Sequence, residues 1–127
     1  MIKKILIVDD SPVARKMLRR CMPEGRDFDI YEAGDGVDGL RKFQEVRPDL
    51  TFMDLTMPIM NGMRAIEEIK KVDSEALIIV NTADVQMKSI FKVLELGSVT
   101  VIKKPPTREA VSEAIARAEQ QAHKEKE

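Results

Sequence analysis

Two adjacent aspartates, Asp9 and Asp10, directly follow the short apolar run 5–8, and a third, Asp54, directly follows the apolar run 50–53. Neighbouring carboxylates repel each other, and each resists loss of water unless a cation or hydrogen bonds compensate its charge. Three carboxylates brought together form a hard oxygen site, which suits Mg²⁺ or Mn²⁺ better than zinc. We therefore expect the three aspartates to hold a divalent cation if the fold joins the ends of both runs.

Two other side chains that can take part in chemistry follow apolar runs: Thr82 comes shortly after 76–80, and Lys104 shortly after 99–102. A metal ion with open coordination positions can bind phosphate oxygens, a lysine can neutralise another oxygen, and a hydroxyl can donate to a third. A carboxylate that faces such a site can attack phosphorus and become an acyl phosphate. The combination predicts phosphoryl chemistry on one of the carboxylates.

Each of these residues also has a plainer explanation. Asp9 and Asp10 can form a turn and a helix cap, and Asp54 can end a strand in a turn. Thr82 can be a helix N-cap, and Lys104 can be an ordinary surface lysine. The placement of all five at the ends of four apolar runs favours the chemical interpretation.

The elements that must position these residues alternate along the chain. Apolar runs of strand length are separated by segments whose apolar residues recur at helical spacing. Five strands alternating with five helices predict a doubly wound α/β fold, with a parallel sheet between two layers of helices. Functional groups of such sheets gather beyond the carboxyl ends of the strands. The predicted strands cover residues 5–8, 28–33, 50–53, 76–80 and 99–102.

Two of the helices are defined by clear apolar patterns. The first starts at Pro12 behind a capping Ser11 and runs until Pro23 stops it, and the fourth ends at Gly97. Their apolar stripes are predicted to face the core, with Met17 and Met87 as core filling. The stripe residues are Val13, Met17, Leu18 and Cys21 in the first helix, and Met87, Ile90, Phe91 and Leu94 in the fourth.

Composition limits the classes of function. The 127 residues suit a single domain over 1–127 that ends in a charged tail at about 122–127. A formal net charge of −1 argues against a nucleic-acid binder, and the single cysteine cannot close an intrachain disulfide. The N-terminal apolar run is too short for a signal peptide or a membrane span, so we expect a cytoplasmic protein.

Four pieces of the sequence resemble the receiver domain of two-component response regulators, the CheY-like domains, in their order and spacing. They are "ILIVDDSP", "PDLTFMDLTMPIMNG", "IIVNTAD" and "LGSVTVIKKPP", and together they span nearly the whole chain. The resemblance implies a flavodoxin-like sheet with strand order 2-1-3-4-5. That order makes strands one and three neighbours, as the acidic cluster requires.

The resemblance also implies a role for each aspartate of the cluster. Asp54 matches the phosphoacceptor, which takes a phosphoryl group from a phosphohistidine. Asp9 and Asp10 match the pair that binds Mg²⁺ (or Mn²⁺) together with Asp54 and the backbone carbonyl of Thr56. Gly62 lies where the loop after the acceptor needs a glycine.

Other matching positions concern the response to phosphorylation and its reversal. Thr82 matches the switch hydroxyl and Lys104 the lysine that pairs with the phosphoryl group. Thr56 and Asp84 occupy the variable positions expected to tune hydrolysis of the acyl phosphate. Val101 stands where many members have an aromatic switch residue, so an aromatic switch is absent in that form.

The partners implied by the resemblance are proteins. A sensor histidine kinase or a phosphotransfer protein would supply the phosphoryl group. A downstream target would bind in trans to the surface of helix four, strand five and helix five. The stand-alone architecture resembles single-domain chemotaxis-type regulators, some of which work with separate phosphatases. Neither nucleic acid nor a membrane is expected as a partner.

Two alternatives to a phosphoaccepting regulator remain open. A metal-dependent phosphohydrolase could use Asp54 as its nucleophile, but such enzymes typically show Asp-x-Asp after the first strand, whereas Asp9 and Asp10 are adjacent here. A receiver-like interaction module that no longer takes phosphate would keep the fold without the chemistry. We expect no enzyme activity apart from the domain's own phosphotransfer and dephosphorylation.

Overall fold

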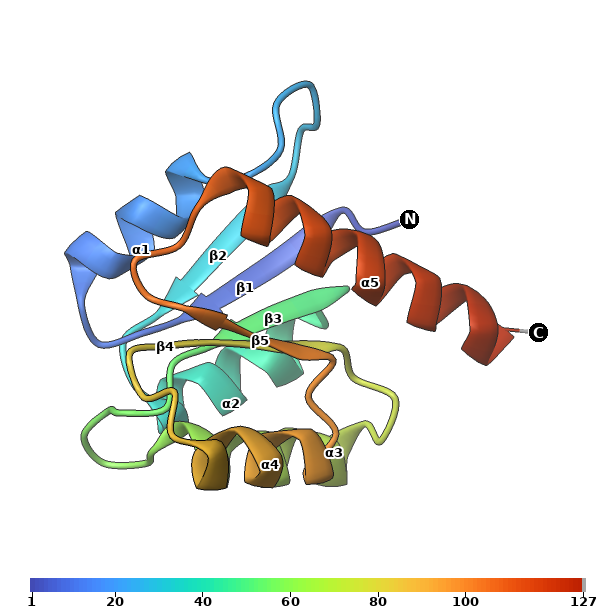
Figure 1. Ribbon diagram of the computed structural model, residues 1–127. Helices are drawn as coiled ribbons and strands as arrows, with labels where there is room; N and C mark the ends of the chain where they lie inside the picture. The colour runs from blue at the N-terminus through green and yellow to red at the C-terminus, as the bar shows by residue number, and fades with distance from the viewer. Residues whose placement is uncertain (127) are drawn as a thin grey trace.

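The computed structural model describes residues 1–126, which form a five-stranded sheet between two layers of helices (Figure 1). All strand pairs are parallel, and the spatial order is β2-β1-β3-β4-β5. This arrangement confirms the predicted fold class and strand order. The strands are β1 (Lys4–Val8), β2 (Asp29–Ala33), β3 (Leu50–Met53), β4 (Ile78–Thr82) and β5 (Thr100–Lys103).

The helices divide between the two faces of the sheet. Helices α1 and α5 cover one face, and α2, α3 and α4 cover the other (Figure 1). Right-handed crossovers between parallel strands produce this division when the chain winds outward from β1 in both directions. The helices are α1 (Pro12–Arg20), α2 (Gly36–Val46), α3 (Gly62–Val72), α4 (Met87–Glu95) and α5 (Arg108–Lys126).

The central strands are buried on both sides, which explains their nearly continuous apolar sequences. In β1, Ile5 and Ile7 pack in the cluster beneath α1 and α5, while Leu6 and Val8 pack in the cluster beneath α2, α3 and α4. All four are at most 1% exposed. The paired, buried strands therefore determine the positions of the residues that directly follow them.

The ends of several elements differ from the sequence prediction, three of them in ways that matter here. Strand β4 continues through Thr82, because Asn81 and Thr82 pair with Ile102 and Lys103 of β5. Hydrogen bonding along the sheet thus extends past the apolar residues that indicated the strand. Helix α1 ends at Arg20, before the predicted stop, and α5 includes residues 122–126 of the segment that we expected to be a tail. Residue 127 lies outside the described residues.

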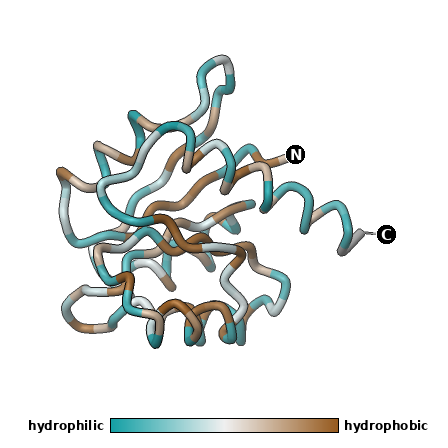
Figure 2. The backbone as a smooth tube through the Cα atoms, viewed as in Figure 1, coloured by the Kyte–Doolittle hydropathy of each residue, from teal (hydrophilic) through white to brown (hydrophobic). Residues whose placement is uncertain are grey.

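The predicted core positions of two methionines are wrong. Met17 is 39% exposed and Met87 is 62% exposed. In α4 the buried residues are Ser89 and Val93, and most of the apolar stripe is exposed. Figure 2 shows in brown how hydrophobic this helix is. An apolar pattern at helical spacing shows that a helix has an apolar face, but not that the protein itself covers it.

The N-terminus and the last described turn of α5 lie at the amino ends of the strands, away from the edge where the strands finish (Figure 1). Met1 and Ile2 border the same surface pocket as Ala122 and His123 near the end of α5. Among residues 1–126, no helix combines the length and the apolar character needed to cross a bilayer.

Candidate functional site

The three aspartates predicted to cluster lie together at the carboxyl edge of the sheet. Each of Asp9, Asp10 and Asp54 offers a carboxylate oxygen, and these oxygens lie within 4.8 Å of one another. The register explains this, because Val8 at the end of β1 is paired with Met53 at the end of β3. Asp9 and Asp54 are 3% and 5% exposed, whereas Asp10 faces solvent. The cluster is thus open on one side only.

Lys104 joins this cluster from the end of β5. Its ammonium lies 2.7 Å from Asp9 Oδ2 and 3.3 Å from Asp54 Oδ1. The backbone holds it there, since Lys104 N donates to Thr82 O at 2.9 Å. The Lys104–Pro105 peptide bond is cis. The lysine therefore bridges the two buried carboxylates and leaves Asp10 on the open side.

The charges of the site shift two pKa values upward. Burial raises the pKa of Asp54 and the charge of Asp9 raises it further, so that the opposing effect of Lys104 is outweighed. Burial lowers the pKa of Lys104, but its hydrogen bond to Asp9 and the charges of Asp54 and Asp9 outweigh burial and raise it. One ammonium thus does not fully compensate the carboxylates around it.

The donor set fits a hard divalent cation. Three carboxylates and one ammonium leave an excess of negative charge, and the carboxylate oxygens are close enough together to share one ion. Oxygen ligands alone favour Mg²⁺ or Mn²⁺ over metals that prefer nitrogen or sulfur. No histidine or cysteine takes part in this group.

A glycine makes the loop after Asp54 possible. A Cβ at Gly62 would lie 2.0 Å from the carbonyl oxygen of Asp54, so only glycine allows the start of α3 to approach this closely. Gly62 N donates to Leu55 O at 3.0 Å, and Asn61 caps α3 through Arg64 N. Thr56 lies exposed in this loop, two residues after Asp54.

Thr82 is buried at the end of β4, and its hydroxyl has a partner in the loop beyond the strand. Asp84 N donates to Thr82 Oγ1 at 3.0 Å. The Asp84 carboxylate in turn accepts from Gln86 N at 3.2 Å and from the Ser89 hydroxyl at 2.7 Å. These bonds connect the end of β4 to the first turn of α4, a connection that no pattern in the sequence predicted.

An arginine that sequence reasoning missed fixes the backbone beside the acidic pair. Arg15 donates to the carbonyl oxygen of Asp9 at 2.6 Å and to Glu32 at the same distance. Arg19 also binds Glu32, at 2.6 Å. The two arginines are four residues apart on α1 and both contact the end of β2. Their spacing, which places them on one face of the helix, is the sequence feature that could have indicated a shared acidic partner.

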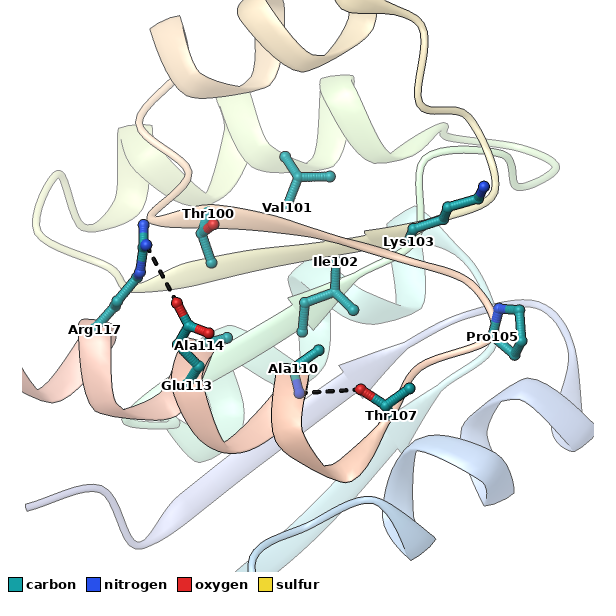
Figure 3. Close-up of a pocket in the computed structure, with 10 residues that line it drawn as sticks. All are labelled: Thr100, Val101, Ile102, Lys103, Pro105, Thr107, Ala110, Glu113, Ala114 and Arg117. Carbon is teal, nitrogen blue, oxygen red and sulfur yellow. Dashed lines mark hydrogen bonds and ion pairs between the residues drawn. The ribbon is translucent and has the colours of Figure 1, made fainter.

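The sheet edge formed by β5 presents a separate cavity of about 280 Å³ against α5 (Figure 3). Val101 lies on β5 and points to the opposite side of the strand from Ile102 (Figure 3). It is half-buried against the cluster that includes α4. The cavity is lined by Thr100, Val101, Ile102, Lys103, Pro105, Thr107, Ala110, Glu113, Ala114 and Arg117.

The fold and the site together define a doubly wound α/β domain with an acidic pocket at its switch point, where strand order reverses between β1 and β3. A family model described as the response regulator receiver domain matches residues 5–116. The chain therefore belongs to the response regulator receiver domain family. Receiver domains are phosphoaccepting signalling domains rather than enzymes that turn over an outside substrate, which counts against the phosphohydrolase alternative.

Relatives in sequence and structure agree with this membership. The chain is 38% identical over 113 residues to the chemotaxis protein CheY of Thermotoga maritima, covering 89% of this chain and 94% of that protein. It is 36% identical over 115 residues to the chemotaxis protein CheY of Bacillus subtilis, covering 91% of this chain and 96% of that protein. Among solved structures, the CheX–CheY–BeF3–Mg²⁺ complex of Borrelia burgdorferi contains a chain with a TM-score of 0.83 and 29% identity, covering 89% of this chain and 86% of that one.

Proposed function

We propose that Asp54 accepts a phosphoryl group from the phosphohistidine of a sensor kinase or a phosphotransfer protein, and that the modified domain then binds a target in trans. The observation that carries the proposal is the juxtaposition of Asp54 with both Lys104, 3.3 Å away, and the Asp9–Asp10 pair. This arrangement supplies a nucleophile, a cation for the phosphoryl group and ligands for a metal at one open edge.

In the proposed transfer, a carboxylate oxygen of Asp54 forms a bond to phosphorus as the phosphorus–nitrogen bond of the donor breaks. The electron pair of that bond returns to the imidazole ring. Lys104 compensates the negative charge of the transferred group, and Asp9, Asp10, Asp54 and the carbonyl of Thr56 would hold Mg²⁺. Bound Mg²⁺ supplies positive charge to the phosphoryl oxygens. Release follows when water attacks phosphorus and the bond between phosphorus and the Asp54 oxygen breaks, which gives inorganic phosphate and restores the carboxylate. Thr56 and Asp84 tune this step.

The proposed response to phosphorylation begins at Thr82. Its hydroxyl donates to a phosphoryl oxygen, and the resulting shift favours one of two arrangements of the surface of α4, β5 and α5. That surface already carries exposed apolar side chains, with Met87 62% and Phe91 58% exposed on α4. Exposed apolar residues grouped on one helix are typical of a protein-binding surface.

A small phosphodonor tests the acceptor directly. We expect purified protein incubated with Mg²⁺ and acetyl phosphate to gain one phosphoryl group by intact mass, and Asp54→Asn to gain none. The matched control is Asp49→Asn, since Asp49 and Asp54 flank the same strand, β3, at opposite ends. Asp49 only accepts hydrogen bonds from Lys3 N and Lys4 N, which an asparagine oxygen can also accept. This control should be phosphorylated like the unmodified protein.

The absence of phosphorylation would favour the alternative of a receiver-like interaction module that does not take phosphate. If no adduct forms in the unmodified protein and Mg²⁺ fails to bind, the domain keeps the receiver fold without its chemistry. An adduct that survives in Asp54→Asn would assign the acceptor role to another residue.

A further inference from the structure

We propose that Asp84 and Ser89 form the link through which the Thr82 hydroxyl sets the position of α4. The inference rests on the proposed function, because it requires that Thr82 moves when Asp54 is phosphorylated. It adds a pair of positioning residues outside the acidic cluster and a specific route from the site to the exposed face of α4.

The link is a continuous series of hydrogen bonds. Thr82 Oγ1 accepts from Asp84 N at 3.0 Å, and Asp84 Oδ2 accepts from the Ser89 hydroxyl at 2.7 Å. Asp84 Oδ1 also accepts from Gln86 N at 3.2 Å. Thr82 is 1% exposed and Ser89 is 9% exposed, so both ends of the series are shielded from competing water. The hydrogen bond from Ser89 and that from Gln86 N lower the pKa of Asp84, which keeps its carboxylate charged.

This series joins the end of β4 to the first turn of α4 through side-chain hydrogen bonds. The N-cap residue, Gln86, makes no side-chain capping bond, and Asp84 instead accepts from Gln86 N and from the Ser89 hydroxyl. Further along the helix, the buried residue is Val93, while Met87, Phe91 and Leu94 are 42–62% exposed. A helix with so little buried surface depends on its terminal bonds for its position, and a small displacement of those bonds can move it.

The neighbouring position on β5 offers no comparable route. Val101 points away from Ile102, toward the layer that contains α4, but its side chain is short, aliphatic and stiff at χ1 (Figure 3). It has neither a polar atom to bond Thr82 nor a ring that could swing between two positions. The Asp84–Ser89 pair therefore carries the coupling.

The proposed step is a change of partner by one hydroxyl. When the Thr82 O–H donates to a phosphoryl oxygen on Asp54, Oγ1 moves toward the site and away from its place beneath Asp84 N. The Asp84 N–H then loses this acceptor or follows it, and either change loosens the carboxylate's hold on Ser89. The first turns of α4 become less protected as a result.

Hydrogen–deuterium exchange of α4 measures this coupling. In the unmodified protein, we expect acetyl phosphate with Mg²⁺ to increase exchange over residues 87–93 by about fivefold, the factor expected for one lost hydrogen bond. In Ser89→Ala, exchange over the same residues should already be raised without phosphorylation, and phosphorylation should add less than about twofold. In Ser89→Thr, which retains a hydroxyl, the full response should return. Intact mass is recorded on each sample to confirm equal phosphorylation.

Ser98→Ala is the matched control. Ser98 is 7% exposed and its hydroxyl donates to Ile78 O and Thr100 O, so its loss also removes buried hydrogen bonds beside α4. Since Ser98 lies beyond the other end of the helix and does not contact Asp84, this variant should keep the phosphorylation response. If Ser89→Ala acted only through a general loss of stability, both variants would show raised exchange and both would keep the increase over residues 87–93 on phosphorylation.

Two results would overturn the inference. A Ser89→Ala protein that is phosphorylated and still shows the full change over 87–93 would exclude the link while leaving the proposed function intact. A phosphorylated unmodified protein with no change in α4 would exclude it as well. If no adduct forms on Asp54 at all, the proposed function fails, and this inference fails with it.

Discussion

The two edges of the sheet each hold acidic side chains, and their charges are compensated in different ways. At the carboxyl edge, the Asp9 and Asp54 carboxylates share one ammonium, that of Lys104, with a third carboxylate close by. Burial and the charge of Asp9 raise the pKa of Asp54. This edge is therefore electrostatically incomplete without a bound cation.

At the amino edge, an acidic side chain has its own donors. Glu119 accepts two bonds from Arg26, at 3.0 and 3.1 Å, and a third from Ile2 N at 3.3 Å. The Arg26 guanidinium also lies 4.7 Å from the centre of the Phe28 ring. The hydrogen bond from Arg26 lowers the pKa of Glu119 more than burial raises it. The negative charge of Glu119 is therefore compensated by Arg26 of the same chain.

The pKa shifts of the two carboxylates thus have opposite directions: that of Glu119, which is paired within the chain, is lowered, and that of Asp54, in the acidic cluster, is raised. Burial is the largest cause of the raised pKa of Asp54, and its side chain is less exposed than that of Glu119. The hydrogen bonds that Glu119 accepts outweigh its burial, whereas those that Asp54 accepts do not outweigh its burial and the charge of Asp9. An undercompensated carboxylate costs stability until a cation binds.

The largest expected effect is that of Mg²⁺ on stability. At a concentration one hundred times its dissociation constant, Mg²⁺ should raise the free energy of unfolding by about 2.7 kcal/mol. Thermal or urea unfolding with and without Mg²⁺ measures this. Asp10→Asn should lose most of the gain and Glu119→Gln should keep it, whereas an equal gain in both variants would place the ion elsewhere.

Breaking the pair at the amino edge should cost slightly less. Glu119→Gln removes a half-buried charged hydrogen-bond acceptor, and we expect a loss of about 2 kcal/mol in unfolding free energy at neutral pH. Because the pKa of Glu119 is lowered in the folded state, its contribution is present above about pH 4.3 and is lost as the pH falls through the folded-state pKa. Urea unfolding at pH 7 and about pH 3 should show a difference between variant and unmodified protein that shrinks in acid.

Neutralising Asp54 should increase the free energy of unfolding, in contrast to the loss expected for Glu119→Gln. Without metal, Asp54→Asn should raise the unfolding free energy by about 1 kcal/mol at neutral pH, since it removes an undercompensated charge. The raised pKa of Asp54 means that its ionised form costs stability above the folded-state pKa, and that this cost disappears below about pH 3.9. The gain should therefore be largest at neutral pH, as urea unfolding across this range would show. A loss of stability on this substitution would contradict the comparison of the two edges.

The smallest effect is expected from an exposed ion pair on α5. Glu113 lies 3.3 Å from Arg117, and both side chains are more than half exposed. Glu113→Gln should change the unfolding free energy by less than about 0.5 kcal/mol, because water screens this pair. Measured beside Glu119→Gln on the same helix, it isolates the effect of burial and of the extra donors.

Much of the site could be predicted from the sequence, because its residues directly follow buried strands. The alternating pattern indicated a parallel sheet, and the strand order implied by the resemblance to receiver domains made β1 and β3 neighbours, which brings Asp9 and Asp54 together. The register between Val8 and Met53 follows from that pairing. Lys104 was predicted for the same reason, from its place after β5.

The features that could not be predicted depend on which face of a helix the protein covers. The apolar residues of α4 gave a clear pattern, yet Phe91 and Leu94 face outward and Ser89 faces inward. Contacts between distant helices and loops were equally hidden, since nothing in the local sequence links Arg26 to Glu119. The backbone of Ile59, with a φ of 70°, could not be predicted either, because β-branched residues rarely adopt a positive φ.

The position of the two chain ends has a practical consequence for measuring partners. The N-terminus and the last described turn of α5 lie at the amino edge of the sheet (Figure 1), while Asp54 and Lys104 follow the carboxyl ends of β3 and β5. A biotin or affinity tag at the N-terminus or after α5 would anchor the domain to a sensor surface with its acidic pocket facing the flowing solution. Kinases, targets and phosphatases could then be compared on the same immobilised protein, before and after phosphorylation.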